Sequence, residues 1–343
     1  MSRAGDVLDR RNLRLLVRHP RVLGRLARNY ARILLGGERR LLRGVEFCVT
    51  YRCQLNCGHC LTKKLIDENR AEMSKDQIVR AIRDLARLGA VFINLTGGEP
   101  LLREDLCDVI AEAARDRGTL ITVASNGLLL AETTARRLAQ AGTAMVTLSL
   151  DGPDAAAHDA RRGCAGAFEA ILRAAAAVKS AGMELWFTTI LTKDDAVSGR
   201  AGRTADLAKQ LGGILTVNLA YAVGNWSGRP ARTSTEEERV FADLLRQPHV
   251  RWEGSTNYLR KGCPAGAEKL YVTPYGEVMP CAVIQRTFGN LLTEPVAEIW
   301  ARMGRVKWFD GCWKECLVAQ DPDFIEREMP RIQGRPGAPW GEP

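Results

Sequence analysis

The chain of 343 residues is 46% hydrophobic and 26% charged, which is ordinary for a globular protein and long enough for one large domain with an extension. No apolar run reaches the roughly 18 residues of a membrane span, and the N-terminus lacks the apolar core of a signal peptide. Ten cysteines without such a signal favour a reducing, cytoplasmic setting over a disulfide framework.

The positive charge is confined to one end of the chain. Residues 1–45 hold twelve arginines, no lysine and three acids, so they carry the whole formal net charge of +9. The remaining residues hold equal numbers of basic and acidic side chains. A nucleic-acid partner is therefore not expected, because the basic character belongs to one short segment.

Residues 10–36 are predicted to be helical, with arginines at steps of three and four on one face and leucines on another. Pro20 is expected to split the segment and to start the second helix, and Gly36-Gly37 to end it. Three roles fit this pattern. The helix lies on an anionic membrane surface, packs its leucines on the protein and shows its arginines to water, or docks an acidic partner.

From residue 45 onward, short apolar segments alternate with helical ones, and Ser74 looks like an N-cap. The predicted strands are 45–50, 91–95, 120–124, 145–150, 184–191 and 214–221. The predicted helices are 74–88, 103–117, 131–141, 165–181, 204–211 and 235–245. Six alternating strands predict a parallel sheet with helices outside and a functional site at the carboxyl ends of the strands.

After about residue 250 the alternation stops. Segments 269–273 and 278–283 flank a turn at Pro274 to Glu277 and predict a β-hairpin. A short helix is expected at 294–303. The tail from Ala319 is rich in proline and glycine, and we expect it to be extended.

Three cysteines follow the first predicted strand with the spacing C-x3-C-x2-C: Cys53, Cys57 and Cys60. A [4Fe–4S] cluster normally takes four thiolates, so three leave one iron open to a substrate or cofactor. A zinc knuckle or three core cysteines are the alternatives, although zinc motifs usually come as two pairs. His59 lies inside the triplet, but beside Cys60 it would compete poorly for the same metal.

This stretch resembles the signature of the radical S-adenosylmethionine (SAM) superfamily, with His59 where an aromatic residue most often stands. Further stretches agree in order, namely 97–100 (Gly-Gly-Glu-Pro), 125–127 (Ser-Asn-Gly), 149–152 (Ser-Leu-Asp-Gly) and a cysteine set from Cys263 to Cys316. The resemblance covers about residues 45–316. It implies an α/β fold. A basic helical segment, 1–44, would precede a partial (β/α)6 barrel of the TIM type, 45–250. A small hairpin-plus-helix domain of the SPASM or twitch type, 251–318, and a tail, 319–343, would follow.

The resemblance also implies the chemistry of the barrel. Cys53, Cys57 and Cys60 would hold a [4Fe–4S] cluster whose open iron binds SAM, and reductive cleavage of SAM would give a 5′-deoxyadenosyl radical. The motif Gly97, Gly98 and Glu99 would accept the methionine ammonium group. The strand-end residues Ser125, Asn126, Ser149 and Asp151 would contact the ribose or the carboxylate of SAM. Ordinary turns at strand ends are the alternative for each of these positions.

Cys263, Cys281, Cys312 and Cys316 form the second cysteine set. A full SPASM domain carries seven cysteines for two auxiliary clusters. The four present here favour the shorter twitch form with one auxiliary [4Fe–4S] cluster. Structural zinc is the alternative, because four thiolates suit both.

Three further cysteines lie outside both sets. Cys107 falls on a predicted helix and is expected to pack. Cys48 on the first strand and Cys164 after the fourth are candidate hydrogen-atom donors, as radical epimerases require. A small buried apolar role is the alternative for each.

We therefore expect a radical SAM enzyme that oxidises or epimerises a small molecule such as a sugar or aminocyclitol, with flavodoxin or ferredoxin as electron donor. Maturation of a ribosomally made peptide is the first alternative. It is weakened by the 45 or so residues before the first strand, which are too few for a leader-binding domain. Modification of a lipid at a membrane surface is a second alternative, and a non-enzymatic iron–sulfur scaffold is a third.

Overall fold

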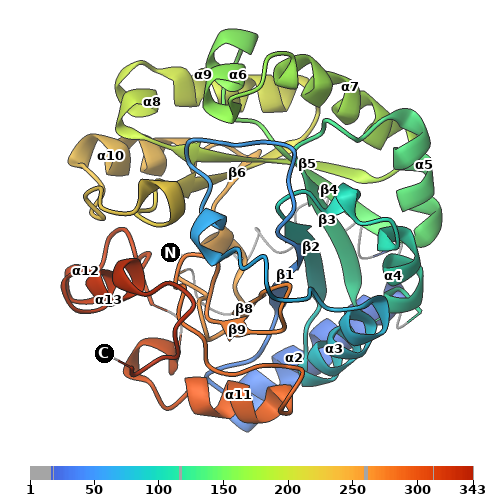
Figure 1. The fold of residues 1–343 in the computed structure, drawn as a ribbon, viewed down its shortest axis with the longest axis vertical. Coiled ribbons are helices and arrows are strands. Elements are labelled where there is room, and N and C mark those ends of the chain that lie inside the picture. The colour runs from blue at the N-terminus through green and yellow to red at the C-terminus, as the bar shows by residue number, and fades with distance from the viewer. Residues whose placement is uncertain (1–16, 18, 116–117, 259–261, 312, 343) are drawn as a thin grey trace.

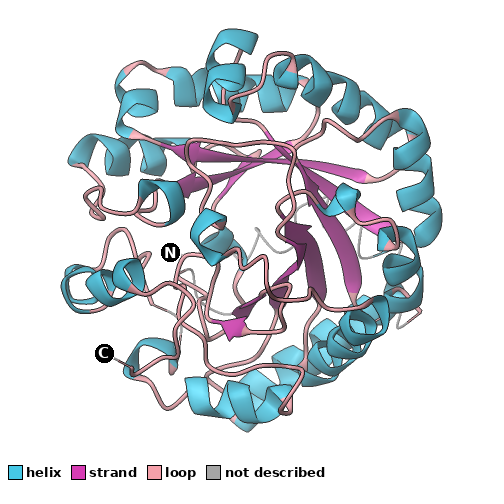
Figure 2. Cartoon of the chain, viewed as in Figure 1, coloured by secondary structure: helices cyan, strands magenta, loops and turns pink. Residues whose placement is uncertain are grey.

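The computed structural model describes residues 17, 19–115, 118–258, 262–311 and 313–342, and within them nine strands form one sheet. The parallel strands are β1 (Gly44–Thr50), β2 (Phe92–Gly97), β3 (Leu120–Ser125), β4 (Thr143–Ser149), β5 (Glu184–Leu191), β6 (Ile214–Leu219) and the short β7 (Val250–Arg251). They lie side by side in sequence order. The sheet curves around a central space with the helices outside it (Figure 1, Figure 2), as predicted for a partial barrel.

The outer layer consists of the helices that connect these strands. They are α3 (Lys75–Leu88), α4 (Leu106–Ala113), α5 (Glu132–Ala141), α6 (Ala155–Arg162), α7 (Ala167–Ser180), α8 (Lys193–Val197), α9 (Arg200–Gln210) and α10 (Thr235–Leu244). Local chemistry sets their ends. The Ser74 hydroxyl accepts from Gln77 N in a capping box at the start of α3, and Gly89 ends that helix. Both ends were predicted from the sequence.

Side chains alternate between the two faces of each strand. On β1, Val45 and Phe47 are buried in the main core against the helices, whereas Glu46 between them lines the interior. On β6, Val217 belongs to the core and Asn218 lines the interior. The barrel therefore has an apolar outer face, and its inner face carries many polar side chains.

The predicted hairpin is present as β8 (Lys269–Val272) and β9 (Val278–Met279). It does not stand apart, because β8 pairs in parallel with β1 and so extends the barrel sheet. Cysteines that follow the barrel in sequence are thereby brought to its interior. The predicted C-terminal helix is α11 (Val296–Met303).

Two parts of the sequence-based prediction were wrong. Helices α6 and α8 were not predicted, because both are short. The tail was expected to be extended but contains α12 (Pro322–Arg327) and α13 (Met329–Gly334). Proline occupies the first turn of each of these helices, where its missing N–H costs nothing, and Phe324 and Ile332 are buried against the main core.

The N-terminal segment forms α2 (Pro20–Gly36), which begins at Pro20 and ends at left-handed Gly37, as predicted. Most of its proposed first half, residues 10–16 and 18, lies outside the described residues. Val22 of α2 packs with Val91 and Leu120, which lie at the amino ends of β2 and β3. The helix thus covers the end of the barrel opposite the cysteine loop that follows β1. None of the described helices is long and apolar enough to cross a membrane.

Candidate functional site

A cavity of about 1060 Å³ occupies the barrel interior, and both cysteine sets contribute to its lining. Cys53, Cys57 and Cys60 line it at the carboxyl end of β1, and Cys263, Cys281 and Cys316 line it beside β8 and β9. Cys312 lies outside the described residues. A substrate in this cavity would therefore lie within reach of both sets.

The end of β2 packs tightly against the cysteine loop. The N–H groups of Gly98 and Glu99 donate to the carbonyl oxygens of Thr50 and Arg52, both at 2.8 Å. A β-carbon at Gly97 would overlap the Thr50 carbonyl oxygen, and one at Gly98 would overlap that of Arg52. The two glycines are therefore required by this close approach of backbones, and both also line the cavity.

Hydrogen-bond donors surround the sulfur atoms of the first set. Leu55 N lies 3.4 Å from Cys53 Sγ, and Asn126 Nδ2 lies 3.8 Å from the same sulfur. Arg162 Nη1 lies 3.8 Å from Cys57 Sγ. Burial raises the pKa of both thiols and so disfavours their thiolate forms. Because a metal binds the thiolate, hydrogen-bond donors that stabilise it favour metal binding. This donor set fits an iron–sulfur cluster, whose properties depend on hydrogen bonds to its sulfur ligands.

Asp151 forms a buried ion pair on the cavity wall. Its Oδ2 lies 2.5 Å from Arg162 Nη2 and 3.5 Å from His59 Nε2. Burial is the largest single influence and favours the neutral acid, but Arg162, His59 and Arg161 together outweigh it and hold the pKa of Asp151 below its usual range. Burial lowers the pKa of His59 to about 4. Arg162 is thus a fixed cation beside Cys57, and it and Asp151 are paired with each other on the wall where SAM is expected.

Glu99 does not line the cavity in the structure. Its carboxylate accepts from Ser125 Oγ at 3.0 Å, from Asn126 N at 2.8 Å and from Leu101 N at 3.1 Å. Burial raises its pKa to about 7. Glu99 therefore holds the end of β3 in place, and contact with the SAM ammonium group stays a prediction. Ser125, Asn126, Ser149 and Asp151 do line the cavity, as expected of residues that contact SAM.

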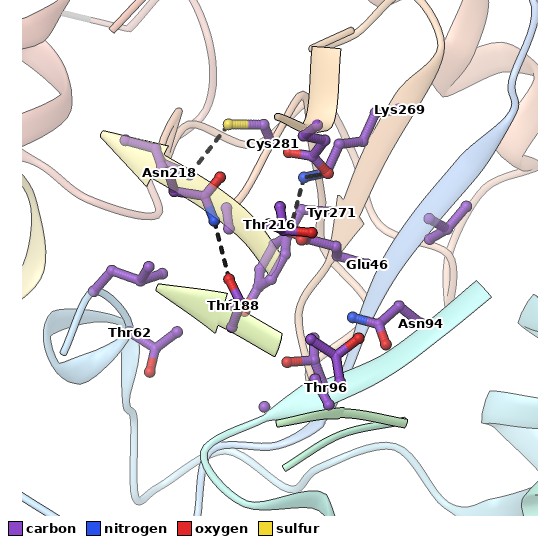
Figure 3. A pocket seen from close by; sticks show the side chains of 18 of the residues that line it. Glu46, Thr62, Asn94, Thr96, Thr188, Thr216, Asn218, Lys269, Tyr271 and Cys281 are labelled. Atoms are coloured by element: carbon purple, nitrogen blue, oxygen red, sulfur yellow. Dashed lines mark hydrogen bonds and ion pairs between the residues drawn. The ribbon is translucent and has the colours of Figure 1, made fainter. Parts of the chain in front are cut away.

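The inner wall carries a row of uncharged polar side chains that the sequence analysis did not identify. They are Asn94, Thr96, Thr122, Thr147, Thr188, Thr216 and Asn218. Thr122 Oγ1 donates to Asn94 Oδ1 at 3.0 Å, and Asn218 Nδ2 donates to Thr188 Oγ1 at 3.2 Å (Figure 3). The signal in the sequence was the alternation of most of these residues with valine, leucine and isoleucine in the strands, although Thr188 lies between Phe187 and Thr189.

Three charged side chains form a cluster on the same wall. Lys269 Nζ lies 3.1 Å from Glu46 Oε2 and also contacts Glu253 (Figure 3 shows Lys269 beside Glu46). Burial raises the pKa of Glu46, although Lys269 acts in the opposite direction. The Glu46 side chain is 29% exposed, and its exposed part faces the cavity. The cluster carries two acids and one cation where a bound substrate would lie.

The second cysteine set is assembled from three separate segments. Cys263 precedes β8, Cys281 follows β9, and Cys316 precedes α12. All three lie near Tyr221, at the carboxyl end of β6. Burial raises the pKa of Tyr221, and each of the three thiolates would raise it further. Burial raises the pKa of Cys281 to about 12. Within the described residues, no three histidine, cysteine or acidic side chains have the spacing for one metal ion. This holds for both cysteine sets, so the positions of the thiols do not by themselves identify either set as a metal site.

Among the described residues, the remaining three cysteines do not line the cavity. Cys48 is completely buried, and its Sγ lies 3.4 Å from the Thr50 carbonyl oxygen. Cys164 follows α6 and contacts the Ala165 carbonyl oxygen at 3.7 Å. Cys107 packs on the core, as expected. A hydrogen-donor role for Cys48 or Cys164 stays a prediction that no contact in the structure supports.

Two family models match the chain. Residues 47–195 match the radical SAM superfamily, and residues 263–322 match the SPASM iron–sulfur cluster-binding domain. The two matches contain the first and second cysteine sets, respectively.

Curated relatives cover most of the chain. It is 32% identical over 276 residues to a PqqA peptide cyclase of Streptomyces rochei, which covers 75% of each protein. It is 28% identical over 313 residues to an AdoMet-dependent heme synthase of Nitratidesulfovibrio vulgaris, covering 80% of this chain and 84% of the relative.

Among solved structures, SuiB of Streptococcus suis bound to S-adenosylmethionine aligns with a TM-score of 0.64 at 17% identity, covering 82% of this chain and 72% of SuiB. This likeness shows the fold. The family matches identify the cofactors as SAM, a [4Fe–4S] cluster and auxiliary iron–sulfur binding in the C-terminal domain. Ligation of the first cluster by Cys53, Cys57 and Cys60 stays a prediction. The chain belongs to the radical SAM superfamily and carries a C-terminal SPASM domain.

Proposed function

We propose that this radical SAM enzyme matures a peptide by oxidising one of its residues. The observation that carries the proposal is the row of threonine and asparagine side chains on the inner wall, between the two cysteine sets. Hydroxyl and amide groups both donate and accept hydrogen bonds, as do the N–H and C=O groups that every peptide bond presents. The wall therefore suits a peptide segment held in the cavity.

The comparisons support a peptide more than the small molecule first expected. One relative is a PqqA peptide cyclase, and SuiB has also been solved with its precursor peptide SuiA. Heme synthases are the competing relatives. A porphyrin presents carboxylates that need cations, and three cations of the cavity wall, Arg43, Arg70 and Lys269, are each paired with an acid, although Arg52 and Lys63 also line it.

An oxidation removes two electrons and two protons from the substrate. Bound SAM and the clusters would supply the radical chemistry, which would take up one hydrogen atom and one electron from the substrate. The second proton then needs a base as the new bond forms. Glu46 is placed for this role, since its carboxylate faces the cavity and lies on the wall shared with Cys281.

Anaerobically reconstituted enzyme tests the substrate class. It would be incubated with SAM, dithionite and, in separate reactions, a random synthetic peptide library, iron coproporphyrin III or a panel of aminosugars. We expect the peptides alone to accelerate 5′-deoxyadenosine formation and to lose the mass of two hydrogen atoms. Acceleration by the porphyrin or the aminosugars, with none by the peptides, would overturn the proposal.

The role of Glu46 is tested by comparing Glu46→Gln with Glu253→Gln, since both acids contact Lys269. We expect Glu46→Gln to keep SAM cleavage and to lose most of the oxidised product, because its amide cannot accept the proton. Glu253→Gln should keep both activities. Equal product from the two variants would show that Glu46 is not the base.

A further inference from the structure

Helix α2 is fixed on the barrel by one face, which determines the side that faces outward. Arg25 Nη1 donates to the carbonyl oxygens of Ala86 at 2.6 Å and Ala90 at 3.0 Å. Asn29 Nδ2 donates to the Gly89 carbonyl oxygen at 2.9 Å and to Tyr258 Oη at 2.6 Å, and Val22 is fully buried. Figure 1 shows α2 at the edge of the molecule beside α3.

The opposite face of α2 is exposed and apolar. Leu23, Leu34 and Leu35 are 41%, 67% and 88% exposed, and the small residues Ala27 and Ala31 lie between them on the same side. Of the eight large hydrophobic side chains exposed in the described residues, four lie within residues 17–35. A helix with one side packed on a domain normally shows water a charged side, whereas no described residue covers this apolar outer face.

Arginines border this outer face along one edge. Arg21, Arg28 and Arg32 are exposed and recur at steps of seven and four, which places them on one side of the helix. Arg32 pairs with Glu38 at 2.9 Å, but α2 itself contains no acid. The surrounding residues 1–45 carry the whole net charge of the protein.

We propose that the outer face of α2 docks the enzyme on an anionic lipid surface. Leucines with small residues between them insert shallowly into the boundary between head groups and acyl chains, and the bordering arginines attract anionic lipid head groups. A lipid surface fits better than a protein partner, because the outer face offers no hydrogen-bonding side chain and only one sign of charge. The cysteine loop, at the other end of the barrel, stays accessible.

The test uses the full-length holoenzyme with vesicles of phosphatidylcholine and phosphatidylglycerol, and with vesicles of phosphatidylcholine alone. We expect sedimentation with the anionic vesicles at low salt, lost at about 1 M salt, where charges are screened beyond roughly 3 Å. The variant Leu23→Ser/Leu34→Ser/Leu35→Ser should bind roughly tenfold more weakly or worse. Arg21→Ser/Arg28→Ser should lose roughly fivefold for each arginine.

Matched controls are Val197→Ser and Arg173→Ser, exposed residues of the same types on other helices, and both should bind like the natural protein. All variants should keep the natural melting temperature and SAM cleavage, because none contacts the barrel core or the cavity. Failure of the natural protein to bind anionic vesicles at low salt would overturn the proposal. So would natural binding by the leucine variant, which would indicate attraction by charge alone. Binding to an acidic flavodoxin that these variants abolish, without vesicle binding, would replace the lipid by a protein.

Discussion

The two cysteine sets line one cavity but are built in different ways. Cys53, Cys57 and Cys60 come from a single loop of eight residues, and Cys53 is exposed. Cys263, Cys281 and Cys316 come from three segments, and Cys263 and Cys316 are buried. Each set also has a half-buried cysteine, and Cys57 is as buried as Cys263, so the exposed Cys53 is the main difference. An exposed ligand suits a cluster that must leave one iron open to SAM.

The side chains that surround the two cysteine sets also differ. Beside the first set, Arg162 and Asn126 direct hydrogen-bond donors at sulfur. Beside the second set lie Tyr221 and the cluster of Lys269, Glu46 and Glu253. The first set therefore has groups that hold a charged cofactor, whereas the second has groups that can move a proton. The comparison implies that the two ends can be disabled separately.

The largest effect should come from Cys53→Ala/Cys57→Ala/Cys60→Ala. Two cubane clusters give about eight irons per chain, and this variant should lose about half of them and all 5′-deoxyadenosine formation. Iron analysis and chromatography of the nucleoside measure the two losses. Cys107→Ala, which removes a cysteine packed on the core, should change neither. Residual SAM cleavage by the triple variant would refute the assignment of the first set.

Removal of one ligand at the other end should separate cleavage from oxidation. Cys281→Ala is expected to lose the auxiliary cluster, to keep forming 5′-deoxyadenosine and to yield little oxidised peptide, because the substrate electron has no acceptor. The measurement is the ratio of oxidised product to 5′-deoxyadenosine. Loss of tightly bound zinc instead of iron from this variant would show that the second set is a structural zinc site.

A smaller effect is expected from Asp151→Asn, which breaks the ion pair with Arg162 on the cavity wall. SAM affinity should fall roughly ten- to a hundredfold, the value of one charge-assisted hydrogen bond, while the iron content stays unchanged. Asp195→Asn is a matched control, because Asp195 is also buried and pairs with Arg161 at 2.7 Å without lining the main cavity. Equilibrium dialysis should show weaker SAM binding for the first variant alone. Equal affinities would remove Asp151 from the SAM site.

The smallest effect concerns pH. His158 is buried, its Nδ1 accepts from Asp151 N at 3.1 Å, and burial lowers its pKa to about 4. The pKa of His158 is lower in the folded protein than in the unfolded chain, where it is near 6.5. The stability that neutral His158 contributes is therefore complete above pH 6.5 and is lost as the pH falls toward 4. Melting temperatures across that range should therefore fall more steeply for the natural protein than for His158→Gln, whose amide accepts the same hydrogen bond without titrating. Parallel curves would contradict this.

Local signals made much of the fold predictable from the sequence. Ser74 caps the start of α3, as expected, and the helices predicted to end at residues 88 and 141 do end there, at Gly89 and Gly142, through caps that depend only on neighbouring residues. The cysteine loop was equally readable, because its ligands lie within a few residues. The family matches confirm the radical SAM assignment and the cofactors.

Features that depend on distant segments were not predictable in the same way. The pairing of β8 with β1, which brings Lys269 opposite Gly44 on the neighbouring strand, has no signature in either segment. The contact between Arg162 and Cys57 spans 105 residues. The helices α12 and α13 were missed for another reason: proline was read as a helix breaker although it sits in the first helical turn.

The alternation of polar and apolar residues along the strands also bears on how this barrel can change its substrate. A threonine on the inner wall has its hydroxyl on the β-carbon and few rotamers, so ordering it around a bound molecule costs little conformational entropy. Its strand neighbours point the other way, into the core that holds the helices. Replacing an inner residue such as Thr147 or Thr216, whose strand neighbours belong to the core, can therefore alter recognition while leaving the stability of the fold nearly unchanged. Substrate preference and folding can then evolve almost independently, as the differing names of relatives at about 30% identity illustrate.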